Sequence, residues 1–410
     1  MTTTVRADPG DALTDDGHYI VISSDCHAGG SHAMYREYLE DRYHEEFDAW
    51  RERYRNPFRD LSGNRRNKNW DHDLRIGEQE TDGYVAEVIF PNTVPPFFPT
   101  GALVARLPGP DDYLPRLAGI RAHNRWLADW CAEHPERRAG IGQIFLNDVD
   151  DAVEDVKWIA SHGLRGGILL PNPPPDAGWL APLYDPVYDP IWRTCQELDV
   201  VVNIHAGGGS PDYGPYPVAG VLWLLETGYF SRRPVAQLIM GGVFERFPGL
   251  KLAVTEQGWG WVPELLATLD RFHAQMTGSG QVGELGFTAD QVPPGRPSEY
   301  FRRNVWIGSG ATPADVERDG DLLVEKLMWG SDYPHAEGSF PHSRQRMAAS
   351  FSGLRPEAAA RVLGGNAAEL YRFPLDRLAS YASRACPTVE EVAAGAEAPS
   401  GGMGEGPMTG

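Results

Sequence analysis

Acidic and imidazole side chains follow several apolar runs of this sequence, at the points where the runs end. The clearest case is Gly330-Ser331-Asp332-Tyr333-Pro334-His335, which comes directly after a short run of strand-forming residues. Near the N-terminus, a run from Tyr19 to Ser24 continues into Asp25-Cys26-His27, and another run, Val200–Ile204, ends at His205. Carboxylates and imidazoles are common ligands of divalent first-row metals. We therefore predict one metal site that is built from distant parts of the sequence.

The spacing within these motifs supports a shared site. Asp25 and His27 are separated by one residue, so both side chains point the same way on a strand, whereas Cys26 points away and is expected to pack in the core. A further run, Ala253-Val254-Thr255, ends at Glu256. Two carboxylates and two imidazoles suit Zn, Mn or Fe better than Mg. We expect one divalent metal ion as the cofactor.

The elements that must position these residues alternate between strands and helices. Most of the strand-like runs are continuously apolar, which is typical of strands that are covered on both faces. Eight such runs are predicted, at Tyr19–Ser24, Val85–Phe90, Gly140–Phe145, Gly166–Leu170, Val200–Ile204, Leu252–Thr255, Val305–Gly308 and Leu327–Gly330. Helical segments are predicted between them at Leu114–Cys131, Val149–Ser161, Ile191–Leu198, Pro234–Phe247 and Trp261–Gln275, and another region of helix at 356–381.

This alternation predicts an α/β protein, specifically a (β/α)8 TIM barrel, with an open doubly wound sheet as the structural alternative. Three long inserted βα loops are expected, at 28–82, 206–229 and 278–299, and they would form pocket walls or dimer contacts. The barrel is predicted to span residues 17–385. The polar segment 1–16 and the Gly/Pro/Glu-rich tail 386–410 are expected to be disordered termini.

Composition excludes several classes of partner. The chain of 410 residues has a formal net charge of −20, which argues against binding to nucleic acid or to an anionic membrane. No basic N-terminal segment with an apolar core is present, and no apolar run approaches the ~18 residues of a membrane span. We therefore expect a cytoplasmic protein whose partner is a small-molecule substrate.

The chain resembles the amidohydrolase superfamily, in the amidohydrolase-related branch that includes aminocarboxymuconate-semialdehyde decarboxylase and γ-resorcylate decarboxylase. The resemblance covers about residues 19–375. It is carried by Asp25-Cys26-His27, Ile89-Phe90-Pro91, Gly163-Leu164-Arg165-Gly166, Ile204-His205, the segment Gly258-Trp259-Gly260-Trp261-Val262-Pro263, the stretch Gly330–His335 and Asn366-Ala367-Ala368-Glu369-Leu370-Tyr371. The resemblance implies one metal ion that is held by Asp25, His27, His205 and Asp332. Relatives often dimerise, so a homodimer is an open alternative to a monomer.

One position departs from the family. Relatives that decarboxylate carry a histidine at the sixth strand, where this chain has Gln257 with Glu256 beside it. Glutamine does not exchange a proton at neutral pH, whereas glutamate does so when its pKa is shifted by burial or by a metal. Glu256 is therefore open to three interpretations: a further ligand, a general acid or base, or a structural group that is bonded to Arg or Trp.

Because of this departure, we expect a metal-dependent hydrolase that acts on a small aromatic or cyclic compound. A metal lowers the pKa of its bound water toward ~7, and Asp332 would accept the proton of that water as general base. His335 would donate to Asp332 or contact the substrate. Two alternatives stay open: a nonoxidative decarboxylase of an aromatic or unsaturated acid, and a non-catalytic binding or scaffold barrel.

Overall fold

The structure is a computed structural model that describes residues 12–55, 63–100 and 106–397. Its centre is an eight-stranded parallel sheet in the order β1-β2-β3-β4-β5-β6-β9-β10. The strands are β1 (Ile22–Ala28), β2 (Ala86–Pro91), β3 (Arg138–Gln143), β4 (Gly167–Leu169), β5 (Val202–Ile204), β6 (Leu252–Thr255), β9 (Val305–Ser309) and β10 (Leu327–Trp329), and a separate antiparallel hairpin pairs β7 (Gln281–Val282) with β8 (Leu285–Gly286).

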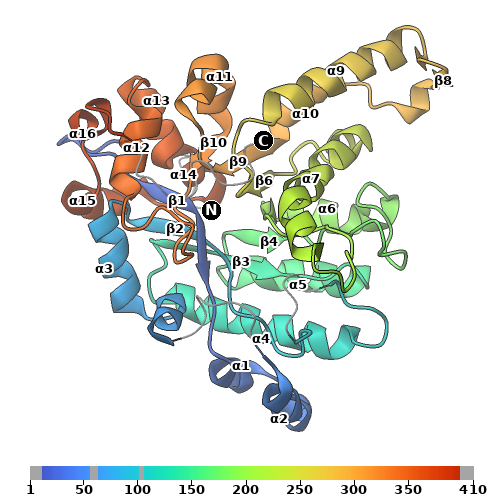
Figure 1. The fold of residues 1–410 in the computed structure, drawn as a ribbon, viewed down its shortest axis with the longest axis horizontal. Coiled ribbons are helices and arrows are strands. Elements are labelled where there is room, and N and C mark those ends of the chain that lie inside the picture. The colour runs from blue at the N-terminus through green and yellow to red at the C-terminus, as the bar shows by residue number, and fades with distance from the viewer. Residues whose placement is uncertain (1–11, 56–62, 101–105, 398–410) are drawn as a thin grey trace.

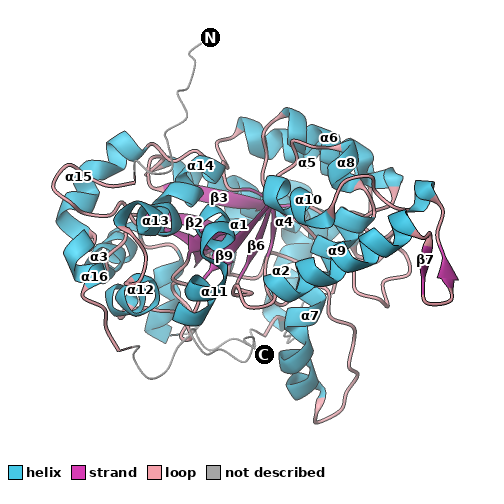
Figure 2. Cartoon of the chain, turned by 90° about the horizontal axis from the view of Figure 1, so that it is seen from above, coloured by secondary structure: helices cyan, strands magenta, loops and turns pink. Residues whose placement is uncertain are grey.

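Helices surround the strands, as Figure 2 shows from above. The helices of the first half are α1 (His32–Tyr38), α2 (His44–Arg53), α3 (His72–Asp82), α4 (Tyr113–Ala132), α5 (Val149–Ser161), α6 (Asp189–Glu197), α7 (Ala219–Met240) and α8 (Val243–Arg246). Those of the second half are α9 (Val262–Gly278), α10 (Pro297–Asn304), α11 (Pro313–Lys326), α12 (Ser343–Phe351), α13 (Pro356–Ala360), α14 (Asn366–Tyr371), α15 (Leu375–Ala385) and α16 (Val389–Ala393). Among the described residues, no helix is both long and apolar enough to span a membrane.

The sheet closes on itself where the last strand meets the first. The backbone N–H of Asp332 donates to the carbonyl of Asp25 at 2.8 Å, and the N–H of His27 donates to the carbonyl of Tyr333 at 2.7 Å. An isolated parallel bridge pairs Cys26 with Tyr333 at the same seam. The predicted (β/α)8 barrel is therefore confirmed, and the strand interiors are buried on both faces as their continuous apolar runs indicate.

Several predicted elements differ from the structure, and the long loop expected at 28–82 contains the helices α1, α2 and α3. The helix expected at Pro234–Phe247 is two helices, and the first of these, α7, begins at Ala219 inside a segment that was predicted to be a loop. Pro234 is accommodated within α7 and is buried. The glycines and aromatic residues before Pro234 concealed this helix, because their helix propensity is low and tertiary packing overrides that preference. The first strand extends through Asp25 and His27 to Ala28 instead of ending at Ser24.

The prediction of disordered termini is wrong for the segments 12–16 and 386–397, and the rest of both predicted tails lies outside the described residues. The two ends pair with each other, because the N–H of Tyr19 donates to the carbonyl of Pro387 at 3.0 Å and the N–H of Val389 donates to the carbonyl of Gly17 at 3.0 Å. Ala12 and Val392 are buried. Figure 1 shows the C-terminal helices α12–α16 together on one side of the barrel, near α3. The prediction of disorder was based on composition, and composition does not reveal that the two ends of the chain pair with each other.

Candidate active site at the carboxyl ends of the strands

The barrel seam brings the first and the last sequence motifs together. The hydrogen bonds between Asp332 and Asp25 and between His27 and Tyr333 fix the two strand ends side by side. The two strand ends lie so close together that a Cβ atom on Gly330 would be 2.5 Å from the Cβ of Asp25. The pairing of β1 with β2 also shifts register between Ser23 and Cys26, an irregularity of the kind that redirects side chains beside active sites. The site therefore depends on a side-chain-free residue at position 330.

The four residues predicted as metal ligands lie close together. The Nε2 atom of His27 is 3.5 Å from Oδ1 of Asp25 and 3.2 Å from Oδ1 of Asp332. The Nε2 atom of His205 is 3.4 Å from the same Asp25 oxygen. Metal–ligand bonds of about 2.0–2.2 Å place neighbouring ligand atoms roughly 3 Å apart. These spacings therefore suit ligand atoms that surround one ion.

Unpaired buried atoms support this interpretation. Within the described part of the chain, Oδ2 of Asp332 is buried and makes neither a hydrogen bond nor an ion pair, and the buried Nε2 of His27 faces Asp25 and Asp332 without a hydrogen bond. A buried polar atom without a partner is costly, and such atoms are explained by a ligand or an ion that completes them. The donor set of two imidazoles and two carboxylates fits a divalent metal such as Mn, Fe or Zn.

His205 is oriented for ligation through one nitrogen. Its Nδ1 lies 3.2 Å from the carbonyl oxygen of Ala206, which accepts only from an N–H. In the neutral form that binds a metal, Nε2 would then carry the lone pair, and this atom faces Asp25. The ring is held by Phe90, whose centroid is 4.6 Å away. A backbone acceptor that fixes the tautomer in this way is typical of metal-binding histidines.

The charges of the site are strongly coupled. Burial raises the pKa of Asp25, but contacts with His205 and His27 outweigh burial and lower that pKa. Burial likewise opposes ionisation of Asp332, yet His335 and His27 hold its pKa well below the usual range. Burial lowers the pKa of His205, but Glu256 and Asp25 outweigh it and raise that pKa to about 9. A divalent cation that binds here would replace the protons of the imidazoles as the positive charge beside these carboxylates, because histidine binds a metal in its neutral form.

His335 contacts Asp332 as predicted. Its Nδ1 is 2.8 Å from Oδ1 of Asp332, and its Nε2 is 3.1 Å from Oδ1 of Asn92. Burial lowers the pKa of His335, but the Asp332 carboxylate outweighs this effect and raises the pKa to about 10. Asn92 was missed at the sequence level, although it follows β2 directly and so shares the strand-end pattern of the other site residues.

The sixth-strand position is occupied by Glu256, not by Gln257. The Glu256 carboxylate lies 3.4 Å from Nδ1 of His205. Gln257 is buried and accepts a hydrogen bond from Nε of Arg232 at 3.1 Å. Glu256 has a φ of 59°, in the left-handed region that side chains other than glycine rarely adopt. Such strain is typical of functional positions, where the surrounding structure holds it in place.

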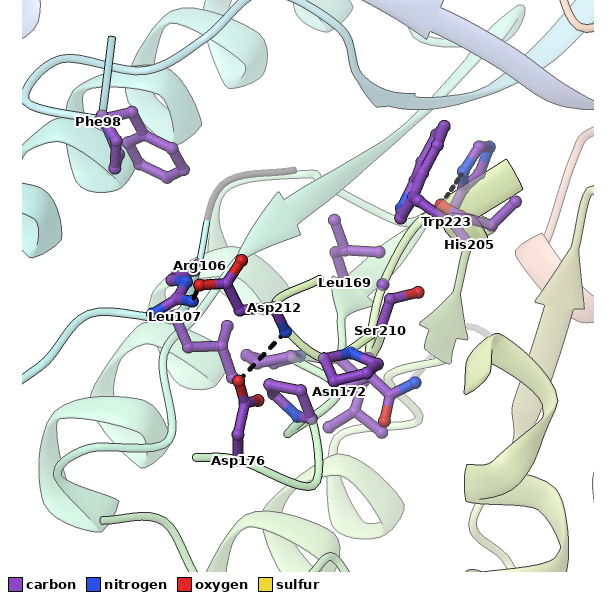
Figure 3. A pocket seen from close by; sticks show the side chains of 18 of the residues that line it. Phe98, Arg106, Leu107, Leu169, Asn172, Asp176, His205, Ser210, Asp212 and Trp223 are labelled. Atoms are coloured by element: carbon purple, nitrogen blue, oxygen red, sulfur yellow. Dashed lines mark hydrogen bonds and ion pairs between the residues drawn. The ribbon is translucent and has the colours of Figure 1, made fainter. Parts of the chain in front are cut away.

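A pocket of about 590 Å³ opens beside His205. Its walls come from the loops after β2, β3, β4 and β5, and from the start of α7. Figure 3 shows His205 and Trp223 at one end and Asp176, Asp212 and Arg106 at the other. An ion pair between Arg106 and Asp212 links two of these loops. Phe98, Phe145, Leu169, Ile204 and Trp223 give the walls an apolar character.

The aromatic residues of the segments that follow β5 and β6 lie in different environments. Tyr213 and Trp223 line the pocket, whereas Tyr216 and Tyr229 are exposed. Trp259 is buried and donates from Nε1 to Oδ2 of Asp319 at 3.0 Å. The sequence does not separate these cases, because whether a loop aromatic faces a pocket depends on the path of the loop.

Cys26 packs as predicted, with its Sγ near the hydroxyl oxygens of Ser23 and Ser331. Burial raises the pKa of this thiol well above its usual range, which keeps it protonated. It is therefore neither a nucleophile nor a ligand in this arrangement.

Comparison with known proteins places this geometry in a family. The amidohydrolase model matches residues 25–373, from the first predicted ligand to just beyond α14. The chain belongs to the amidohydrolase family.

Within the family, the chain is 27% identical over 232 residues to γ-resorcylate decarboxylase of Rhodococcus jostii, a match that covers 52% of this chain and 65% of the relative. It is 26% identical over 317 residues to 2-amino-3-carboxymuconate-6-semialdehyde decarboxylase of Dictyostelium discoideum, covering 73% of this chain and 76% of that enzyme. The fold is also that of 5-carboxyvanillate decarboxylase of Novosphingobium aromaticivorans in complex with manganese and 4-hydroxy-3-methoxy-5-nitrobenzoic acid. That structure superposes with a TM-score of 0.62 at 19% identity, covering 88% of this chain and 99% of that one.

These relatives correct one expectation. The sequence departure at Glu256 and Gln257 led us to expect hydrolysis with Asp332 as general base. Both curated relatives are decarboxylases, so the expectation of a hydrolase is wrong. The structure supplies a physical reason: the absence of a sixth-strand imidazole does not remove proton-carrying groups, because Glu256 and His335 both reach the site.

Proposed function

We propose that this protein is a metal-dependent, nonoxidative decarboxylase of a small aromatic or unsaturated carboxylic acid. The observation that carries the proposal is the agreement between the family match and the site. The family match spans residues 25–373 and so includes Asp25, His27, His205 and Asp332, and the relatives γ-resorcylate decarboxylase and 2-amino-3-carboxymuconate-6-semialdehyde decarboxylase are decarboxylases.

Manganese is the metal that we propose for the site. Asp25, His27, His205 and Asp332 would hold it, since their ligand atoms face one another and the relative of known structure was obtained with manganese. A divalent ion bound there would polarise substrate oxygens and stabilise negative charge as a Lewis acid.

Decarboxylation needs an acid rather than a base at the reacting carbon. The carbon–carbon bond breaks, CO2 leaves, and the bonding electron pair stays on the substrate carbon until a proton bonds there. We assign the proton supply to Glu256, which contacts His205, with His335, which contacts Asp332, as the second group that can carry a proton. Burial, opposed by His205 and aided by Asp332 and Asp25, raises the pKa of Glu256 to about 8. A carboxyl group whose pKa is raised toward neutrality can carry a proton and release it.

The pocket beside His205 suits a planar substrate. Its volume of about 590 Å³ lies in the range of small-molecule sites, and its apolar walls would hold an aromatic ring next to the ligand cluster. The substrate carboxylate would then face the metal ligands, where Oδ2 of Asp332 is buried without a hydrogen bond or ion pair to any described residue.

The test is a labelled turnover experiment. Protein loaded with Mn²⁺ would be mixed in D2O with γ-resorcylate, 5-carboxyvanillate and related acids, each labelled with carbon-13 in the carboxyl group. Release of labelled CO2 with one deuterium at the vacated carbon would support the proposal. A His27→Ala/His205→Ala double variant is the control and should release none. Incorporation of oxygen from labelled water without CO2 release would contradict decarboxylation.

A further inference from the structure

A buried charge cluster lies between α3 and the first two strands, behind the ligand side chains. Arg75 of α3 is fully buried, and so is Glu87 of β2. The guanidinium donates to the Glu87 carboxylate from Nε at 2.9 Å and from the second terminal nitrogen at 2.5 Å. Gln79, one turn further along α3, donates to the same carboxylate at 2.7 Å. Glu87 thereby accepts from two residues of one helix face.

The remaining terminal nitrogen of Arg75 is directed at the first metal-ligand strand. It donates to the carbonyl oxygen of His27 at 2.8 Å and to the carbonyl oxygen of Lys68 at 2.9 Å. The Arg75 guanidinium also lies 4.8 Å from the centroid of the Tyr333 ring. Tyr333 follows Asp332 and accepts the N–H of His27 through its own carbonyl. One side chain therefore contacts the residues on both sides of the barrel seam.

The backbone of His27 is consequently held at both of its polar groups. Its N–H is bonded to Tyr333, and its C=O is bonded to Arg75. With both groups fixed, the Cα–Cβ direction is fixed, and the imidazole is delivered to Asp25 and Asp332 at 3.5 and 3.2 Å. A metal site tolerates errors of only about 0.2 Å in its ligand distances. A contact that holds the peptide of a ligand is thus expected to affect affinity for the ion.

We propose that Arg75 is a positioning residue that holds His27, and with it the Asp332 turn, in the geometry required for metal binding. This inference rests on the metal site of the proposed function, but not on the reaction. Stability alone accounts poorly for the cluster, because buried ion pairs are often no more stabilising than apolar residues of similar volume. The planar fork of arginine matches the observed geometry, since it reaches a carboxylate on one edge and two carbonyls on the other.

Two variants separate positioning from folding. Arg75→Lys keeps the charge beside Glu87 but lacks the fork that reaches both His27 and Lys68. A double variant, Arg75→Met/Glu87→Met, removes the ion pair between Arg75 and Glu87. Arg138, whose Nε lies 3.7 Å from Glu87, keeps its hydrogen bond to the carbonyl of Trp130 and its contact with the Trp130 ring in this variant. Gln79→Leu is the matched control, because Gln79 is equally buried and bonds to the same carboxylate but does not touch His27.

The measurement is the affinity for Mn²⁺, followed by the electron paramagnetic resonance of the free ion, beside thermal unfolding of the same samples without metal. We expect Arg75→Lys and the double variant to bind Mn²⁺ about 10- to 100-fold more weakly, the range seen when a group that supports a ligand is lost. Gln79→Leu should bind like the unaltered protein.

Unchanged Mn²⁺ affinity in both Arg75 variants would overturn the inference, as would an unaltered protein that binds no Mn²⁺. An equal loss in Gln79→Leu would also overturn it, because the effect would then belong to general packing. The proposed function can fail independently of this inference. A protein that binds Mn²⁺ tightly but releases no CO2 from any of the acids would refute decarboxylation, and the Mn²⁺ affinities of the variants would still decide the role of Arg75.

Discussion

Substitution of Gly330 by alanine tests the seam on which the site depends. The backbone of Gly330 does not have a positive φ, so alanine is strained there only by its neighbours. The added Cβ would lie 2.5 Å from the Cβ of Asp25 and 3.3 Å from its backbone nitrogen. Carbon atoms in contact prefer about 3.5–4.0 Å. The two strand ends must therefore separate by roughly 1 Å, which is several times the tolerance of about 0.2 Å of a metal–ligand bond.

Two consequences follow from this displacement. Overpacking of this kind typically lowers the free energy of unfolding by about 1–3 kcal/mol, so the variant should fold. Asp25 should leave the ligand set, and the loss of a direct ligand should exceed the 10- to 100-fold effect of losing a supporting group. We expect Mn²⁺ affinity to fall by at least about 100-fold, with turnover falling in parallel.

Equilibrium Mn²⁺ titration and thermal unfolding of metal-free protein measure the two effects separately. Gly320→Ala is the matched control, because no atom lies within 4 Å of its added Cβ and Gly320 lies in α11, away from the ligands. It should keep full affinity and gain up to about 1 kcal/mol of stability. Mn²⁺ affinity of Gly330→Ala within a factor of three of the unaltered protein would refute the assignment of Asp25 as a ligand.

Three further predictions concern single side chains. Asp332→Asn should abolish turnover as measured by CO2 release, and a normal rate would end the proposed role of this carboxylate. Glu256→Gln should keep Mn²⁺ binding but lower the rate at least roughly tenfold, the scale of acid–base groups, whereas unchanged turnover would exclude proton transfer by Glu256. Burial lowers the pKa of His123 to about 4, against about 6.5 in an unfolded chain. The unfolded chain therefore takes up a proton first as the pH falls, and the free energy of unfolding should decrease between pH 6.5 and 4 by up to about 3 kcal/mol. Chemical denaturation at several pH values should show this decrease, and His123→Phe should lack that part of it.

Much of the fold follows from local pattern. The eight predicted strand runs coincide with the eight barrel strands within a few residues, because a strand that is covered on both faces carries apolar side chains on both. The candidate site residues were predicted by the same logic, since parallel strands present their carboxyl ends at one face of a barrel. Asp25, His27, His205 and Asp332 all lie at such ends and contact one another in pairs.

Errors arose where a local pattern admits more than one outcome. The start of α7 at Ala219 and the ordered segment 386–397 both depend on packing against distant parts of the chain. The reaction class was also misjudged, because the sixth strand was judged by the residue type at one position. The left-handed backbone of Glu256 presents its carboxylate to His205, and no sequence pattern signals that conformation.

The sequence by itself determined the barrel and the candidate ligand side chains with their placement at strand ends, because hydrophobic periodicity and residue chemistry are local properties. Tertiary structure decided which of these groups meet. Closure of β10 against β1 joins Asp332 to Asp25 across 307 residues of chain, and it places Arg75 behind His27. Such contacts depend on how the whole barrel closes and on the paths of its loops, so they become definite only when the chain is folded.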